Sequence, residues 1–308
     1  PLADWFLWQS VLSNASWESG DALQSTWEDG GKFSLAARDA DTNVAAHTPN
    51  FASAQEYYMY IQMDNVYYQV KQATVNEASI DAAIDGIATT SWAGFGTDFI
   101  EITGTDRSNL IGVIGEVNST SNPGYPVNTV GTVANTYHEW ADYGGTTSAF
   151  IKNRLSSIDV RHTPEGGAED TYTFPVTGLG FTYNNALTYL TPEEIASLNI
   201  PIGQFTGSRT ITGNFTAYLR VGADSSSQFL RNIVNDTRTS LSDYSSANLQ
   251  IGGTTAPFVA IDMPAVNLNF PTHSIEDVIG ISVEFLAQET ASGKGTGDEM
   301  TMIVSGVS

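Results

Sequence analysis

Cysteine is absent from this chain of 308 residues. A chain without Cys has no disulfide framework, no thiolate metal site and no Cys nucleophile. Basic residues are scarce as well, because 12 Lys and Arg stand against 34 Asp and Glu, which gives a formal net charge of −22. Phosphate binding requires clustered Lys and Arg, so this balance argues against a protein whose main surface binds nucleic acid. No apolar run approaches the roughly 20 residues of a membrane-spanning helix, and no membrane partner is expected.

The motifs of common enzyme classes are missing too. The four His residues are scattered, without HxH, HExxH or HxxxH spacing, so no zinc site is predicted. There is no GxSxG elbow and no GxGxxG after a strand. The adjacent carboxylates Glu193 and Glu194 have the chemistry for glycoside hydrolysis, but they follow Thr191-Pro192 as acids of a first helical turn would. The sequence predicts a non-enzyme without cofactor or metal.

What the sequence does contain is the pattern of a β protein. Short runs rich in Tyr, Val, Ile, Thr and Phe are separated about every ten residues by Gly, Asn, Ser and Thr. Helical signals are few, at Leu2–Leu12 and Ser227–Asn235. The predicted strands are Tyr57–Met63, Val66–Val75, Ile87–Trp92, Asp98–Thr103, Ile158–His162, Tyr172–Val176, Phe181–Tyr189, Arg209–Val221, Phe258–Ile261, Ala265–Asn269 and Ile279–Gln288. In the last strand Ser282, Glu284 and Gln288 alternate with apolar residues, which predicts one buried face and one polar face.

An internal repeat relates two parts of the chain. Residues 66–80 match residues 179–195, with Tyr68 aligned to Phe181 and Ala73 to Ala186. In each copy the sequence predicts an acidic turn, at 77–85 and 193–198, and after it a Thr/Ser-rich strand. A repeat of this length predicts a duplicated structural unit.

Two irregular stretches and an aromatic N-terminus are candidates for contacts. Residues 108–145 are rich in Gly, Asn, Ser and Pro, and residues 291–298 read ASGKGTGD. Connections of this kind often touch a partner. Trp5 and Trp8 belong to a Trp-rich segment that is either a cap on the domain's own core or an arm that packs on a neighbouring subunit.

Three blocks of sequence resemble the major tail tube protein of long-tailed, siphovirus-type bacteriophages. They are DAAIDGIATTSWAGFG (Asp81–Gly96), FIKNRLSSIDV (Phe150–Val160) and NNALTYLTPEEIASLNIPIGQFTGSRTITGNFTAYL (Asn184–Leu219). The last block is specific in its order of elements: a Thr/Tyr strand, the TPEE turn, Pro-Ile-Gly and then Gly-Asn-Phe-Thr. The resemblance covers about 57–219 and implies a structural virion protein.

The resemblance implies a mainly β fold of β-sandwich or barrel-like tube domains with one or two short flanking helices. Together with the repeat, it predicts two similar domains in tandem, at residues 1–148 and 149–308, with 108–145 as a long loop of the first. Family members with a duplicated domain form trimeric rings of pseudo-sixfold symmetry that stack into a hollow tail. The expected partners are therefore other copies of the chain, together with the tape measure, tail terminator and distal tail proteins. The expected location is the virion tail, after assembly in the host bacterial cytoplasm.

DNA passes through such a tube without specific binding, and a lumen lined with carboxylates would repel its phosphates. The candidate lumen-facing acids are Glu77, Asp81, Asp85, Glu193 and Glu194, with solvated turn acids as the alternative. Contacts between subunits are expected from the N-terminal arm and the two irregular stretches. Their candidate residues are Trp5, Trp8, Asn118, Tyr125 and Lys294.

Two other functions remain open on sequence alone. A secreted or surface β-sandwich that binds glycans, such as an adhesin or carbohydrate-binding module, would also be acidic and rich in Thr, Asn, Gly and aromatic residues. A glycan-degrading β enzyme would lose turnover when one acid pair is neutralised. The repeat and the block Asn184–Leu219 favour the tube protein over both.

Overall fold

The fold was analysed in a computed structural model. The structure describes residues 8, 11–12, 16–19, 31–34, 57–63, 66–104, 151, 153–162, 169–190, 203–222, 225–236, 245–253, 258–269, 272–275, 279–290 and 298–305. The chain forms two compact units. Unit 1 comprises Pro1–Gln55, Thr74–Phe95 and Phe150–Val307, and unit 2 comprises Glu56–Ala73, Gly96–Ala149 and Ser308.

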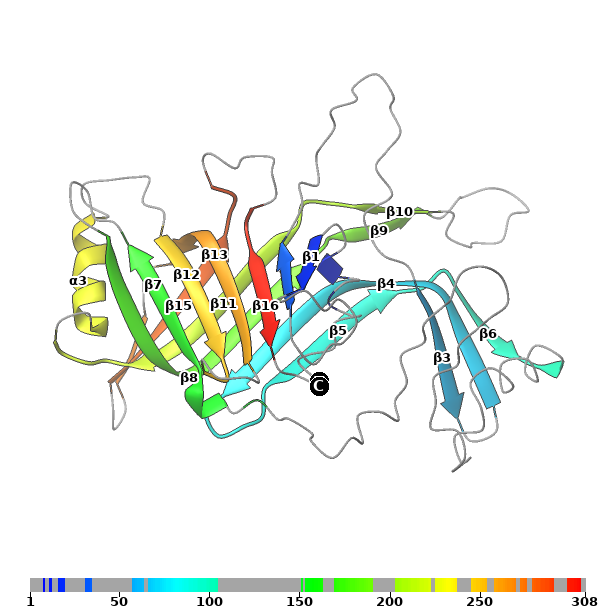
Figure 1. The fold of residues 1–308 in the computed structure, drawn as a ribbon, viewed down its shortest axis with the longest axis horizontal. Coiled ribbons are helices and arrows are strands. Elements are labelled where there is room, and N and C mark those ends of the chain that lie inside the picture. The colour runs from blue at the N-terminus through cyan, green and yellow to red at the C-terminus, as the bar shows by residue number, and fades with distance from the viewer. Residues whose placement is uncertain are drawn as a thin grey trace, which may run out of the picture. The chain divides into compact units, whose positions relative to one another are not determined.

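The fold is mainly β (Figure 1). The strands of unit 1 are β1 (Ser16–Ser19), β2 (Gly31–Ser34), β5 (Thr89–Phe95), β7 (Ser157–His162), β8 (Asp170–Asn184), β9 (Leu187–Leu190), β10 (Gly203–Thr206), β11 (Thr210–Tyr218), β12 (Ser245–Ile251), β13 (Phe258–Leu268), β14 (Thr272–Ile275), β15 (Ile279–Ala287) and β16 (Thr301–Ser305). Unit 2 holds β3 (Tyr57–Met63) and β6 (Asp98–Ile102), and the long strand β4 (Val66–Ala83) contributes to both units. The helix α3 (Ser226–Asp236) and the 3-10 turn η4 (Asn153–Leu155) belong to unit 1.

Six antiparallel strands of unit 1 close on themselves. They follow one another in the order β13–β12–β7–β8–β11–β15, and β15 returns to β13 through the pair Val266↔Ala287. The sheet continues beyond these six strands in two places. β13 pairs with β16, which is followed by β2 and β1, and β8 pairs with β4, which is followed by β5. Closure removes the exposed edges of these six strands, so their backbone groups are paired within the chain.

The core fills the inside of this closed sheet. Alternate residues of each strand are buried, as in β15, where Ile281, Val283 and Phe285 are at most 3% exposed. The centroid of the Phe174 ring lies 5.5 Å from the ring centroid of Phe215 and 5.2 Å from that of Phe229 in α3. Aromatic side chains bury the largest apolar areas, so these contacts join α3 to the sheet and contribute much of its stability.

A polar contact on α3 completes this packing. The Asn232 Nδ2 group donates to the hydroxyl of Tyr172 at 2.6 Å, and that hydroxyl donates to Asp170 Oδ2 at 3.2 Å. The Tyr172 ring is fully buried against Phe229. The helix is thus held on β8 by an aromatic contact and by a hydrogen-bonded chain.

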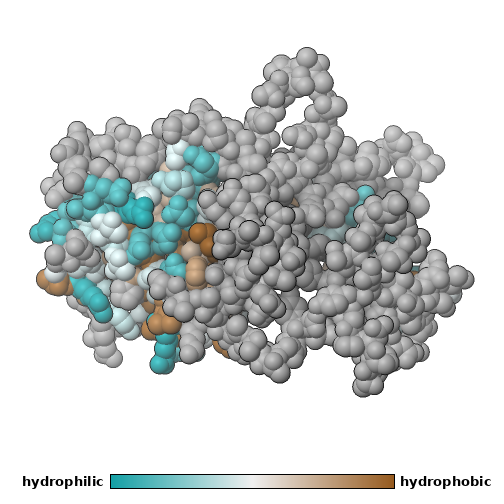
Figure 2. All heavy atoms as spheres, viewed as in Figure 1, coloured by the Kyte–Doolittle hydropathy of each residue, from teal (hydrophilic) through white to brown (hydrophobic). Residues whose placement is uncertain are grey.

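Hydrophilic and hydrophobic side chains are interspersed on the surface of the described residues around α3, β7 and β12 (Figure 2). Hydrophobic residues appear there only in small groups. Among the described residues, no helix is long and apolar enough to cross a membrane.

Unit 2 contains a three-stranded antiparallel sheet in the order β3–β4–β6. Its strand β4 is paired here through residues 66–73, and Gln72 has a positive φ of 46°. The Tyr68 and Phe99 rings stack at 5.1 Å, and Lys71 forms an ion pair with Asp98 at 3.1 Å.

The predicted strands are confirmed in outline and corrected in extent. Two predicted runs, 172–176 and 181–189, belong to one bent path made of β8 and β9, and runs 258–261 and 265–269 form the single strand β13. The acidic turn predicted at 77–85 is wrong, because β4 continues to Ala83. The reason is visible in the burial of Ala78, Ile80 and Ala82, which continues the strand alternation across the acids.

Both copies of the predicted repeat contribute to the same sheet, since β4 pairs with β8 in antiparallel register. The closed core itself is built from residues after position 150. The tandem arrangement of two similar domains, 1–148 and 149–308, therefore stays a prediction.

Candidate functional site

One face of the sheet in unit 1 is polar, and it faces away from the core. Five neighbouring strands contribute to it in the order β5–β4–β8–β11–β15. Because residues opposite one another in an antiparallel pair point to the same side, the register defines its members. This polar face consists of Thr89, Ser91, Ala93, Glu77, Ser79, Asp81, Ala83, Gly178, Gly180, Thr182, Asn184, Thr210, Thr212, Asn214, Thr216, Ser282, Glu284 and Leu286.

The side chains of the polar face are short. Leu286 apart, its members are Gly, Ala, Ser, Thr, Asn, Asp and Glu. A Cβ at Gly180 would lie 2.4 Å from Oδ1 of the exposed Asn214, so a larger residue at this position would displace that side chain. On the core side, Gly213 makes room for the Phe285 ring in the same way. Small residues on one side and close packing on the other give a smooth surface.

Hydrogen bonds between strands hold the side chains of this face in place. The Ser79 and Thr182 hydroxyls lie 3.2 Å apart, and the Thr177 and Thr216 hydroxyls lie 2.9 Å apart beside them. Asn184 Nδ2 donates to the Glu77 carboxylate at 2.6 Å. Thr and Ser pairs across strands stabilise a sheet without adding bulk to its surface.

The polar face carries only negative charge. Its ionisable members are Glu77, Asp81 and Glu284, and no Lys or Arg belongs to it as defined. Asp81 and Glu284 are exposed, and both lie in the row Asp81–Gly180–Asn214–Glu284 that crosses four strands. A surface of this kind repels polyanions and offers them no cation to bind.

A buried asparagine stabilises the bend at which β8 passes into β9. Asn185 is fully buried, and its Nδ2 group donates to the carbonyl of Val11 at 2.5 Å. The next residue, Ala186, has a positive φ of 49°, a conformation that non-glycine residues rarely adopt. The Asn76 side chain accepts a hydrogen bond from the Leu187 amide at 2.7 Å. These contacts hold the end of β8 in the position that brings Asn184 to Glu77.

The predicted lumen-facing acids fall into three groups. Glu77 and Asp81 lie on the polar face, within β4. Asp85 follows the end of β4, is exposed, and forms an ion pair with Arg154 at 3.5 Å. Glu193 and Glu194 lie outside the described residues. Sequence reasoning missed Glu284, although the alternation of residues 281–288 had already assigned it to a polar face.

Of the predicted contact residues, only Trp8 lies in the described part of the chain. Its side chain is fully buried, and its ring lies 4.8 Å from the Trp92 ring in an edge-on arrangement. This is the placement expected for a cap on the chain's own core. Trp5, Asn118, Tyr125 and Lys294 lie outside the described residues, as does the loop 108–145.

The absence of a catalytic and of a metal-binding set stays a prediction from the sequence. Across the part of the chain that the structure describes, no group of three or more His, Asp or Glu side chains is placed to hold a metal ion.

Comparisons with known proteins agree with this architecture. Residues 19–287 match the family model described as phage tail tube protein. The chain is also 27% identical over 246 residues to tail tube protein pb6 of Escherichia phage T5, a match that covers 79% of this chain and 46% of that protein. The chain thus spans about half the length of this relative. The match to the family model includes most of the chain and all five strands of the polar face, and we conclude that the chain belongs to the phage tail tube protein family.

Proposed function

We propose that this chain is the repeating subunit of a phage tail tube and that its polar face lines the conduit. Copies of the chain would form rings, and stacked rings would form the hollow passage for genome ejection. The family supports a structural, non-enzymatic role in the virion tail, and it does not support the glycan-binding alternative. The observation that carries the assignment of the face is its combination of short side chains with charge of one sign.

The electrostatics of the face suit a conduit for DNA. Each phosphate of a passing duplex is negative, and a wall with carboxylates and without Lys or Arg cannot hold it by ion pairs. Low dielectric walls and like charge repel the duplex toward the axis of the passage. Short side chains leave the bore wide. DNA is therefore transported and not specifically bound.

Besides β1 at the other end of the sheet, two strands at the ends of the polar face could join copies of the chain. In the described part of the chain, β5 pairs only with β4, and β14 pairs only with β15. An unpaired strand edge in a stable protein is normally covered or paired with another chain. Pairing of such edges between neighbouring copies would continue the polar face around a ring.

The number of copies in a ring follows from the repeat. If each chain supplies two of six equivalent positions, the ring is a trimer with pseudo-sixfold symmetry. Each copy of the repeat bends at a non-glycine residue of positive φ, which is Gln72 within β4 in one copy and Ala186 between β8 and β9 in the other. The sequence alignment brings these two bends to within one position of each other.

Other contacts are assigned to segments outside the described residues. Contacts between rings would involve residues 108–145, the N-terminal segment and residues 291–297. The tape measure, tail terminator and distal tail proteins complete the expected set of partners, and assembly would take place in the host bacterial cytoplasm.

Electron microscopy of the purified chain tests the assembly. Negative-stain images at several concentrations should show rings or hollow filaments, and the measured mass per ring should equal three chains. Six chains in a ring would contradict the trimer. A chain that stays monomeric at every concentration, with or without tail initiator proteins, would contradict the function itself.

A pair of charge reversals tests which face lines the conduit. D81K/E284K places two Lys residues on the polar face, and E101K/E169K places two at exposed positions elsewhere, with the same change in net charge. Tubes of D81K/E284K should retain duplex DNA at low salt at least about ten-fold better than the control, with a steep loss of binding as salt rises. Equal DNA retention by the two variants would show that the polar face does not line the passage.

A further inference from the structure

The exposed apolar side chains of unit 1 are concentrated at the two ends of the sheet that carries the polar face. Among the described residues of unit 1, eight large apolar side chains are exposed. Five lie at the end of the sheet where β4 and β11 finish, and two, Phe95 of β5 and Leu286 of β15, lie at the opposite end. The eighth is Ile303 of β16. We call the group of five the apolar rim, and its members are Ile84, Ile87, Leu155, Tyr218 and Val221.

Hydrogen bonds hold the segments of the apolar rim together. The Ile84 amide donates to the carbonyl of Thr177 at 3.1 Å, and the Thr177 hydroxyl donates to the carbonyl of Thr216 at 3.2 Å. The end of β4 is therefore joined through β8 to the end of β11. Asn153 Nδ2 donates to the carbonyl of Ala83 at 2.9 Å, which places η4 beside the end of β4. The rim is thus a continuous part of the fold and not a set of unrelated side chains.

The apolar rim differs in charge from the chain as a whole. Asp85 and Arg154 form an exposed ion pair within it, and Arg220 is exposed next to Val221. Two Arg residues therefore accompany one Asp, in a chain in which 34 acidic residues outnumber 12 basic ones. The rim combines exposed apolar side chains with a positive balance of charge.

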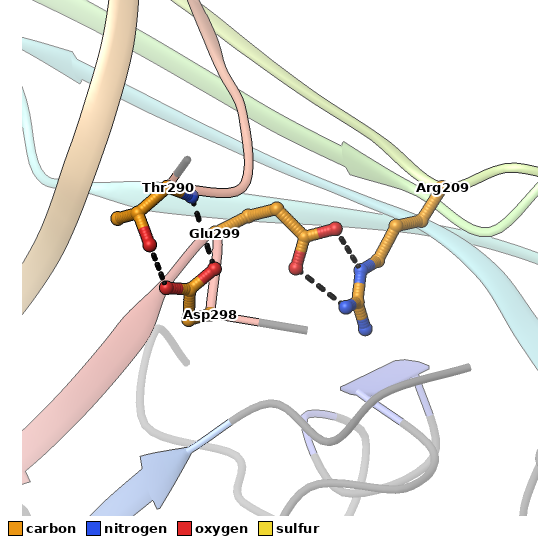
Figure 3. Close-up of polar contacts among 4 residues, drawn as sticks. All are labelled: Arg209, Thr290, Asp298 and Glu299. Carbon is orange, nitrogen blue, oxygen red and sulfur yellow. Dashed lines mark hydrogen bonds and ion pairs between the residues drawn. The ribbon is translucent and has the colours of Figure 1, made fainter. Parts of the chain in front are cut away.

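A pocket of about 410 Å³ lies at the opposite end of the same sheet, where β11 begins and β15 ends. Figure 3 shows two of its side chains, with the Arg209 guanidinium facing the Glu299 carboxylate. Arg209 Nε donates to that carboxylate at 2.8 Å and Arg209 Nη2 at 2.5 Å. Beside them, the Thr290 amide and hydroxyl donate to the Asp298 carboxylate at 3.1 Å and 2.5 Å. We call it the Arg209 pocket, and its lining includes Arg209, Thr210, Leu286, Gln288, Glu289 and Glu299.

The Arg209 pocket has a negative balance of charge. Burial lowers the pKa of Arg209, but hydrogen bonding to Glu299 and interactions with Tyr183 and Glu299 together outweigh it, so the pKa is raised from its ordinary value. The guanidinium thus stays charged and is matched by Glu299. Glu289 is a second carboxylate in the lining, so two acids accompany one base.

The two ends of the sheet are complementary to each other and not to themselves. One end presents exposed apolar side chains with a positive balance, and the other presents a hollow with a negative balance. Contact between two rims, or between two pockets, would bring like charges together, whereas contact between unlike ends brings opposite charges together. A contact between unlike ends joins copies head to tail, and where the copies do not close into a ring it produces an open stack.

We propose that the apolar rim of one copy of the chain docks at the Arg209 pocket of a second copy in the next ring. The inference rests on the proposed function, since it takes copies of the chain to form stacked rings. Burial of the apolar rim drives the contact, and the opposite charges set its direction. Because both ends belong to strands of the polar face, this contact continues the polar face from one ring to the next. All subunits of the tube then point the same way.

Chemical cross-linking tests which ends meet. The chain contains no Cys, so an introduced Cys is its only thiol. I87C places a thiol on the rim, and Q288C places one at the pocket. Tubes assembled from an equal mixture of the two variants and treated with a bismaleimide should give at least about ten-fold more covalent dimer than tubes of either variant alone. As much dimer from either variant alone would show that like ends meet and would overturn the proposal, as would the absence of dimer from every combination.

A pair of charge variants tests whether the contact supports stacking. I87E/R220E makes the rim polar and negative at two exposed positions, so the Tm should stay within a few degrees of wild type and rings should still form. The yield of sedimentable tubes should fall at least about ten-fold, because the rim now repels the pocket. The matched control I303E/R231E makes the same two substitutions at exposed positions of β16 and α3, and its tube yield should equal that of wild type.

The outcomes separate this contact from the assembly as a whole. An equal yield of tubes from I87E/R220E and from its control would overturn the proposal. Loss of rings together with tubes in I87E/R220E would place the rim within a ring and would overturn it as well. Failure of the wild-type chain to form rings or tubes under any condition would instead defeat the proposed function.

Discussion

Unit 1 and unit 2 are both built from antiparallel strands, but among the residues that the structure describes only those of unit 1 form a core. In unit 1 every strand of the closed sheet buries alternate side chains. In the described part of unit 2, only Ala73 and Ile102 are buried, while Tyr58, Met63 and Phe99 are each more than half exposed. Strand-forming residues are abundant in both. The difference arises because the sheet of unit 1 closes on itself, whereas three strands cannot enclose an interior.

The two units differ in what stabilises their sheets. A closed sheet gains stability from its own apolar burial. A three-stranded sheet with exposed apolar side chains is only marginally stable without a further packing surface. The ion pairs of the two units differ in burial as well. The Arg209–Glu299 pair of unit 1 is largely buried, whereas the Lys71–Asp98 pair of unit 2 is about one third exposed. Matched substitutions in the two units test whether burial determines what each contact contributes.

Aromatic truncation should show the largest difference. Phe215→Ala removes a fully buried ring packed on Phe174, and the free energy of unfolding should fall by about 3–5 kcal/mol. Phe99→Ala removes a ring that is 57% exposed and stacked on Tyr68, with an expected loss of about 1 kcal/mol. Urea denaturation followed by circular dichroism measures both. Equal losses would show that unit 2 is as tightly packed as unit 1.

Breaking one side of each ion pair should give the next largest difference. Arg209→Met leaves Glu299 buried without its partner and should destabilise the fold by about 3–5 kcal/mol. Lys71→Met breaks an exposed pair, for which about 0–1 kcal/mol is expected.

The pH dependence of the Arg209 contribution follows from the direction of its pKa shift. Because the folded-state pKa of Arg209 is raised above its ordinary value, the stabilisation is complete below the pKa of the unfolded chain and is lost only as pH rises through the higher folded value. Thermal melts of Arg209→Met and wild type should therefore differ by the same amount at pH 6 and pH 9. A difference that changes between these pH values would contradict a permanently charged guanidinium.

Removal of a buried side-chain amide and of a half-buried one should show a smaller difference in the free energy of unfolding. Asn185→Ala leaves the carbonyl of Val11 without its donor inside the core and should cost about 1–3 kcal/mol. Gln69→Ala removes a hydrogen bond to the Tyr60 hydroxyl at 2.9 Å in unit 2, where water can replace it, and should cost less than about 1 kcal/mol. Denaturant midpoints at constant m-value provide the measurement. The ranking is contradicted if Gln69→Ala has the larger effect.

The smallest effect is expected on the polar face. Asp81→Asn removes an exposed charge without disturbing packing, and the free energy of unfolding of the subunit should change by no more than about 0.5 kcal/mol. Differential scanning calorimetry of the variant checks this value. A large loss of stability would mean that Asp81 has a structural role, in place of the role in the conduit.

Many of the strands could be predicted from the sequence because apolar and polar residues alternate along them. The polar face of β15 was read correctly from Ser282 and Glu284, and α3 was placed within a residue at each end. The predicted strands leave out residues 177–180, whereas β8 runs through them without a break. In the structure Gly180 lies inside β8, where Asn214 of the neighbouring strand occupies the space that a side chain would fill. A local sequence window contains no information about that neighbour.

The missed strand β12 shows the same limit. Its sequence, SSANLQI, has few residues of high β propensity, yet Ala247, Leu249 and Ile251 alternate with exposed or half-buried neighbours. Packing against β7 and β13 decides its conformation.

Part of the polar face was predicted from the sequence, but the structural reason for that prediction was incorrect. Glu77 and Asp81 were assigned to a turn, but they share a face because both lie in β4. Their grouping with Glu284 depends on β4 pairing with β8, β8 with β11 and β11 with β15. The pair Arg209–Glu299 likewise joins positions far apart in the sequence. Periodicity identifies which face a residue belongs to, whereas only long-range pairing identifies its companions on that face.

The pairing of β2 with β16 has a consequence for synthesis on the ribosome. Residues 31–34 are synthesised about 270 residues before their partners, residues 301–304. At about 5–20 residues per second, β2 waits of the order of tens of seconds for its neighbour. The wait is much shorter for β13, because its partner β16 follows only about 40 residues later. A nascent chain therefore cannot complete this part of the sheet until residues 301–304 have been synthesised and have left the ribosome.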